Sequence, residues 1–104
     1  MKTFKYLSLF YSERTIHIDT TDQETLDWIV ASIKRSAPSY TTKNLPYGGV
    51  SFEKLQGKDL AIGSWIRSQL CLKGWEIITV THHTVNGNSG APTYHFIFET
   101  VTSS

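Results

Sequence analysis

One stretch near the middle of the chain, residues 59–81, restricts the fold most, because its periodicity changes at a single glycine. In its first half, apolar residues recur three or four positions apart, which indicates the buried side of an amphipathic helix. Gly74 follows, and a residue without Cβ readily takes the left-handed conformation that ends many helices. From Glu76 onward, apolar and polar residues alternate as in a strand. We therefore expect a helix joined to a strand, with Trp65 and Trp75 in the core.

The first part of the chain predicts a hairpin and another helix. Residues 4–11 and 15–19 alternate as two strands on either side of a tight turn, and the apolar character of both sides of 4–11 suits a central strand or one covered on both faces. Residues 21–36 carry apolar side chains at i, i+3, i+4 and i+7, which is typical of an amphipathic helix. Thr21 and Glu24 have the spacing of a capping box, so we expect the helix to begin there.

The remaining segments predict a loop and three more strands. Residues 38–50 lack periodicity and contain proline, glycine and tyrosine, so we expect a long loop before a short strand at 50–55. Two further strands, at 76–85 and 93–101, are joined by the glycine-rich residues 86–92. Alternation along these two strands predicts one buried face formed by Ile78, Val80, Tyr94, Phe96 and Phe98.

The order of elements is strand, strand, helix, short strand, helix, strand, strand (ββαβαββ). This order predicts an α+β two-layer sandwich in which two helices pack on one face of an antiparallel sheet of four to five strands. The length of 104 residues suits a single domain spanning 1–104.

Charge and hydropathy narrow the class of partner. The chain has ten Lys and Arg against nine Asp and Glu, a net charge of +1, whereas a nucleic-acid-binding domain usually carries a basic excess. We therefore consider nucleic acid an unlikely partner. The apolar run at 1–11 is interrupted by Ser8 and lacks a small-residue cleavage site, and no run is long enough to span a bilayer. We expect a soluble cytoplasmic protein that does not bind a membrane.

The second half of the chain contains a recognisable combination of features. A helix with Ile66 and Leu70 leads through Gly74-Trp75-Glu76-Ile77-Ile78 into a strand, and a glycine-rich loop precedes the aromatic strand Tyr94–Glu99. This half, from Ile62 to Glu99, resembles the small uncharacterised bacterial domains known as DUF4177. The resemblance implies a bacterial origin and the fold of this half, and it implies no activity.

The histidines and the cysteine are the residues that could carry chemistry. His83 and His95 could face each other across two strands and hold an ion, with His17 or Glu99 as a third ligand. Two exposed imidazoles on a polar face are the alternative that we favour. Cys71 has apolar neighbours, which indicates a small buried thiol. We expect no metal, no other cofactor and no catalytic residues.

Surface hydrophobic residues lead to our first hypothesis, a non-enzymatic protein-interaction or regulatory domain. Ile77 and Ile97 interrupt an otherwise polar sheet face, which would allow two sheets to pack together or two edges to pair in a homo-oligomer. His83 and His95 belong to the same predicted face. Trp28 lies between the buried positions of its helix and could serve as an interface anchor.

The alternative hypothesis comes from another class, small-molecule binding. The loop 38–50 could cover a site on the sheet, with Tyr40, Tyr47 and Trp28 as contact residues. An enzyme is the class least supported by the sequence, because no nucleophile, base and orienting group can be named together.

Overall fold

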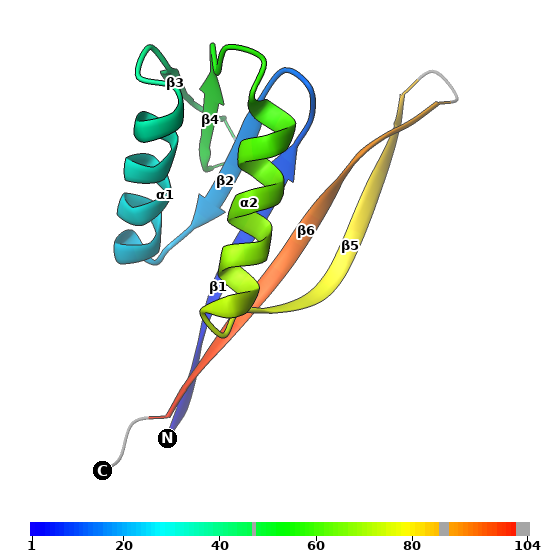
Figure 1. Cartoon of the computed structure of the whole chain (residues 1–104). Coiled ribbons are helices and arrows are strands. Elements are labelled where there is room, and N and C mark those ends of the chain that lie inside the picture. The colour runs from blue at the N-terminus through cyan, green and yellow to red at the C-terminus, as the bar shows by residue number, and fades with distance from the viewer. Residues whose placement is uncertain (47, 86–87, 102–104) are drawn as a thin grey trace.

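The computed structural model describes residues 1–46, 48–85 and 88–101, with side chains described outside 83–89. Two helices lie on one face of a six-stranded antiparallel sheet, so the α+β class is confirmed (Figure 1). The strands lie in the order β3-β4-β2-β1-β6-β5. The elements are β1 (Lys2–Tyr11), β2 (Ile16–Thr20), α1 (Gln23–Ser36), β3 (Thr41–Asn44), β4 (Val50–Glu53), α2 (Asp59–Leu72), β5 (Glu76–Val85) and β6 (Asn88–Val101).

The core lies between the helices and one face of the sheet, and β1 runs through its centre. Leu7 of β1 pairs with Phe96 of β6, and Leu9 pairs with Ile18 of β2. All four side chains are almost completely buried. The predicted central position of this strand is confirmed, and it joins the β3-β4-β2 half of the sheet to the β6-β5 half.

The predicted helix–glycine–strand unit is present. The buried residues of α2 include Ile62, Ile66 and Leu70. Gly74 has a φ of +102°, and the Trp75 N–H donates to the Leu70 carbonyl at 3.0 Å, which closes the end of the helix. Trp75 is 5% exposed and packs against Phe98, so its predicted core position is confirmed.

The predicted positions of Trp65 and Cys71 are wrong. Trp65 is 41% exposed and Cys71 is exposed as well. Each residue lies one position from a buried residue, Ile66 or Leu70, and one step around a helix moves a side chain by about 100°. The buried side of α2 therefore includes fewer of its apolar residues than the sequence pattern predicted.

The start of α1 also differs from the prediction. The helix begins at Gln23 with Asp22 as the N-cap, and Thr21 and Glu24 form no capping box. The Thr25 hydroxyl donates to the Asp22 carboxylate instead. The body of the helix agrees with the predicted amphipathic pattern, because Ile29 and Ile33 are fully buried.

The sheet has six strands, compared with the predicted four to five. The extra strand, β3, lies within the predicted loop 38–50 and pairs with β4, with Thr41 opposite Glu53. All four residues of β3 are exposed, so no apolar alternation marked it in the sequence. β6 likewise begins at Asn88, inside the predicted connection 86–92, because residues 88–92 continue the pairing with β5.

A β-bulge changes the predicted faces of β5. Its register on β6 shifts between Ile77 and Thr79, and such a bulge adds one residue to one strand. Ile78 and Val80, predicted to be buried, are 52% and 42% exposed. β5 and β6 also curve away from the helices, which leaves this part of the sheet with less cover (Figure 1).

Gly63 marks the closest approach of α2 to the sheet. A Cβ atom on Gly63 would lie 2.3 Å from Cγ of Tyr11, which is much shorter than a van der Waals contact. Tyr11 in turn stacks on Tyr94, and Arg67 donates to the Tyr94 hydroxyl at 3.0 Å. The position of the helix over β1 and β6 therefore depends on a residue without a side chain.

Gly63→Ala is expected to lower the free energy of unfolding by about 1–3 kcal/mol through overpacking, although alanine is the better helix former. Urea unfolding followed by circular dichroism measures this change. Ser68→Ala, at an exposed position of the same helix, is the control and should cost almost nothing. A Gly63→Ala variant as stable as the wild type would contradict the close contact with Tyr11.

Candidate functional site

The face of the sheet opposite the helices is open and partly apolar. Alternation along β1 turns Leu7 and Leu9 toward the helices and turns Phe4, Tyr6 and Phe10 the other way. Phe4 is 60% exposed and Tyr6 is 43% exposed. We call this surface the open face.

A pocket of about 520 Å³ lies on the open face, beside the segment that connects β3 to β4. Its walls come from β1, β2 and β6 and from that segment. They combine aromatic and aliphatic groups with a few polar ones, which is the usual composition of small-molecule sites. The lining residues are Ser8, Phe10, His17, Ile18, Asp19, Leu45, Gly48, Gly90, Ala91 and Thr93.

Two consecutive glycines bring the connecting segment against β2. Gly48 and Gly49 have φ values of +100° and +91°, and a Cβ on Gly49 would lie 2.7 Å from the Ile18 carbonyl oxygen. The turn is closed by the Leu45 N–H, which donates to the Gly49 carbonyl at 3.0 Å. Residues with side chains could not follow this path without strain, so the pocket depends on the glycine pair.

His17 and Asp19 supply the titratable groups of the pocket. The ring of His17 lies 5.0 Å from that of Phe10. Burial lowers the pKa of His17 below its ordinary value of 6.5, and the Glu53 carboxylate opposes this effect only in part. The imidazole is therefore neutral at pH 7. The exposed Asp19 side chain makes no hydrogen bond or ion pair with any other described residue.

The predicted pair of His83 and His95 does not form, because the register of β5 on β6 sets Thr79 opposite His95 and His82 opposite Pro92. The side chain of His83 lies outside the described residues. His95 lies on the open face, where its Nδ1 and the Tyr6 hydroxyl share a hydrogen bond of 2.6 Å. Its Nε2 is 3.1 Å from the Thr81 hydroxyl. Within the described part of the chain, no three His, Cys, Asp or Glu side chains gather as a metal site would require.

Ile77 and Ile97 lie on opposite faces, so their predicted shared surface is wrong. Ile97 pairs with Tyr6 and Glu76 on the open face, whereas Ile77 pairs with Phe96 on the helix side. Uninterrupted alternation predicts Ile78 on the same face as Phe96, and no local pattern in the sequence marks the bulge that follows Ile77.

The aromatic residues predicted to line a site beside residues 38–50 do not come together. Trp28 lies 5.6 Å from Trp65 on the helices, with the Lys73 Nζ 4.7 Å above its ring. Tyr40 packs against the buried Phe52. Tyr47 lies outside the described residues. A pocket does adjoin this segment, but its described lining includes neither Trp28 nor Tyr40. Of the side chains named as candidates from the sequence, only His17 belongs to this lining.

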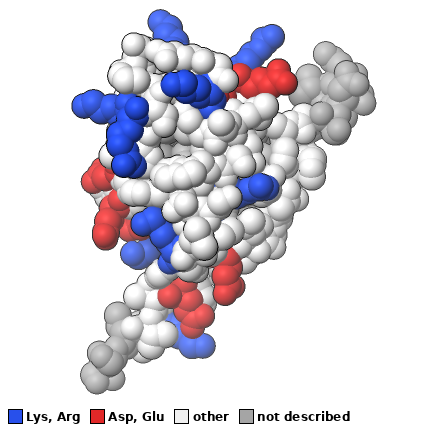
Figure 2. Space-filling view, in the orientation of Figure 1, with Lys and Arg blue, Asp and Glu red and all other residues white. Residues whose placement is uncertain are grey.

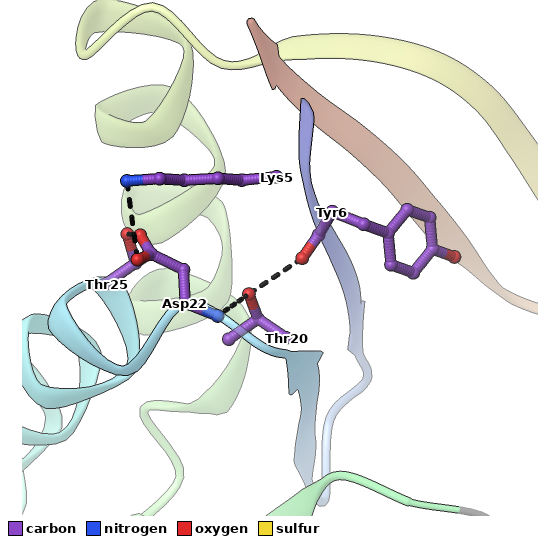
Figure 3. Close-up of polar contacts among 5 residues, drawn as sticks. All are labelled: Lys5, Tyr6, Thr20, Asp22 and Thr25. Atoms are coloured by element: carbon purple, nitrogen blue, oxygen red, sulfur yellow. Dashed lines mark hydrogen bonds and ion pairs between the residues drawn. The ribbon is translucent and has the colours of Figure 1, made fainter. Parts of the chain in front are cut away.

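A second hollow, of about 440 Å³, opens between the helices and β6, where polar contacts fix the start of α1 (Figure 3). The Thr20 hydroxyl donates to the Tyr6 carbonyl at 2.7 Å and accepts from the Asp22 N–H at 3.1 Å. Lys5 pairs with the Asp22 carboxylate at 3.4 Å. Lys5 and Lys73, the two cations of this hollow, are thus already engaged, the second by the ring of Trp28.

The two edges of the sheet are unlike each other. β3 is four residues long, fully exposed and contains Lys43. β5 is ten residues long and contains no Asp, Glu, Lys, Arg or Pro after Glu76. On and beside β5, exposed hydrophobic residues form what we call the β5 strip: Leu72, Ile77, Ile78 and Val80.

On the side that carries the helices, basic and acidic residues are interspersed (Figure 2). Neither helix in the described part of the chain has the length and apolarity needed to cross a membrane.

Comparison with protein-family models, with curated proteins and with solved structures finds no match to this chain. The resemblance to DUF4177 therefore stays a prediction.

The lowered pKa of His17 predicts a pH dependence of stability. Because the unfolded chain takes up a proton near pH 6.5 and the folded chain only at lower pH, stability is full above pH 6.5 and falls as the pH drops below it. Thermal unfolding at pH 7.5 and pH 5 should therefore show a smaller loss for His17→Gln than for the wild type. Equal losses, or an NMR titration that places the pKa of His17 above 6.5, would show that the imidazole is not held neutral by burial.

Proposed function

We propose that this chain is a non-enzymatic protein-interaction domain that self-associates through the free edge of β5. The observation that carries the proposal is the length and composition of that edge. Ten residues at the border of the sheet present unpaired backbone groups, and their side chains include Ile77, Ile78 and Val80, each at least 40% exposed. Such an edge is a ready template for another strand.

The contrast with the other edge supports this proposal. Natural sheets protect an edge by keeping the strand short or by placing lysine on it, and β3 has both properties. β5 has neither. Its bulges, between Ile77 and Thr79 and between His82 and Thr84, leave Thr79–His82 in regular pairing with β6. This regular stretch can accept a strand on its other side.

A second copy of the chain is the occupant that best fits the edge. In a two-fold antiparallel register centred on Val80, the Val80 side chains of the two copies lie opposite each other, and Thr79 of one copy lies opposite Thr81 of the partner copy. This register stays within the regular stretch Thr79–His82 and places one apolar side chain beside another and one threonine beside another. The Thr79–Thr81 pair occurs twice by symmetry, so one strand supplies both halves of the contact.

Apolar burial adds to the backbone hydrogen bonds of such a pairing. Leu72 is 78% exposed, and a hollow of about 530 Å³ between α2 and β5 is lined by Leu72 and Ile77 among others. A partner strand beside β5 would cover part of this surface. Removing apolar area from water contributes about 25 cal/mol per Å², which favours association over leaving the β5 strip in solvent.

A second candidate function is the binding of a small molecule on the open face. The pocket beside Leu45 and Gly48 favours it. The two functions can coexist, because β1, β2 and β6 provide the strand residues of the pocket and β5 provides the free edge.

Sedimentation equilibrium at about 10–100 μM tests the self-association, and we expect a dimer for the wild type. Val80→Lys should raise the dimer Kd at least about tenfold, because it places two lysines opposite each other at the dimer axis and removes the apolar contact there. Leu60→Lys is the matched control, since Leu60 is an apolar residue of similar exposure on α2, 48% compared with 42%.

Both variants should retain the wild-type circular dichroism spectrum. A wild-type protein that stays monomeric over the whole concentration range would overturn the proposal. A dimer that Val80→Lys and Leu60→Lys affect equally would rule out the β5 edge as the interface.

A further inference from the structure

We infer that the pocket on the open face binds a small organic cation, an ammonium group attached to a compact aromatic or aliphatic body. This inference rests on the second candidate function and does not depend on self-association. It follows from three properties of the pocket: its volume, the distribution of its apolar walls and the sign of its charge.

The volume suits the body of such a ligand. A pocket of about 520 Å³ falls within the range of roughly 300–1,000 Å³ that small-molecule sites occupy. Three of its lining residues, Gly48, Gly90 and Ala91, have little or no side chain and leave the space free. Phe10 and Leu45 offer apolar surface on which a flat or branched hydrocarbon body can pack.

The charge of the pocket selects a cation. Among the described residues of the lining, Asp19 is the only one charged at pH 7, since these residues include no lysine or arginine and burial keeps His17 neutral. The Asp19 carboxylate has no partner among the described side chains. A ligand ammonium beside it gains a charge-assisted hydrogen bond, whereas a ligand carboxylate would be repelled.

The polar groups near the carboxylate can complete the contact with the head group. Ser8 lies directly opposite Asp19 in the register of β1 and β2, so both side chains lie on the same face of the sheet. The serine hydroxyl can accept a hydrogen bond from a second ammonium proton. The imidazole of His17 is neutral, so it does not repel the ligand ammonium.

The hollow between the helices is a weaker candidate for a ligand. It contains as many acidic residues as basic ones, Asp22 and Glu24 against Lys5 and Lys73, so it does not select a charge. Its lysines already contact Asp22 and the ring of Trp28. We assign these residues to holding α1 and α2 on the sheet.

The test compares two probes with similar bodies and opposite charges, 2-phenylethylamine and 3-phenylpropionate. Each is titrated into ¹⁵N-labelled protein and followed by amide chemical shifts. The amine is expected to shift the amides of Phe10, His17 and Asp19 at concentrations up to about 10 mM, and to bind at least about tenfold more tightly than the carboxylate.

Asp19→Asn should weaken amine binding about tenfold and remove the preference between the probes. Glu99→Gln is the matched control, because Glu99 is an exposed carboxylate of the same face that lies outside the pocket and pairs with Lys2. Ala91→Trp, which fills the pocket, should abolish the shifts caused by either probe. Because Asp19 is exposed and makes no side-chain contact of this kind, its substitution is expected to leave the fold intact.

Amine binding that is unchanged in Asp19→Asn, equal affinity for both probes, or an absence of shifts at about 10 mM amine would each overturn the inference. The Val80→Lys variant separates this result from self-association, since it should bind the amine as the wild type does. A monomeric wild type that binds the amine would refute the proposed dimer and leave the pocket assignment standing.

Discussion

The structure depends on the burial of one side of β1 beneath the helices. Leu7 and Leu9 are completely buried, and this strand joins the two halves of the sheet. Gly63 lets α2 approach the strand so closely that even a methyl group would collide with Tyr11. Apolar side chains are thus buried on a single face of the sheet, the one that carries Leu7 and Leu9. The tight packing of α2 on β1 fixes the position of the helix on this face.

The surfaces that we connect with function follow from this one-sided arrangement. Two helices of fourteen residues each cannot cover both faces of six strands. The face opposite the helices keeps Phe4, Tyr6 and the pocket at Asp19 in solvent. β5, at the border of the sheet and curved away from α2, keeps the β5 strip exposed (Figure 1). Both the ligand pocket and the association edge therefore lie on parts of the sheet that the helices do not cover.

The sequence was sufficient for local structure and insufficient for register. The period change at Gly74 and the apolar spacing of α1 predicted two helices and a buried Trp75, because these signals act within a few residues. β3 escaped prediction because none of its side chains is buried. The bulge after Ile77 depends on pairing with a strand almost twenty residues away, so the predicted face of Ile77 is wrong whereas that of Ile97 is right. The pocket required Gly48 and Gly49 to fold back against β2, a contact that no local pattern indicates.

The central claim is that the helices cover the Leu7 and Leu9 side of β1 and leave the Phe4 and Tyr6 side open. Nuclear Overhauser effects between side chains report this directly. The account predicts cross-peaks from the Ile66 and Leu70 methyl groups of α2 to the methyl groups of Leu7 or Leu9, and none to the rings of Phe4 or Tyr6. Cross-peaks from either α2 residue to those two rings would mean that the helices lie on the opposite face, which would contradict both proposed surfaces.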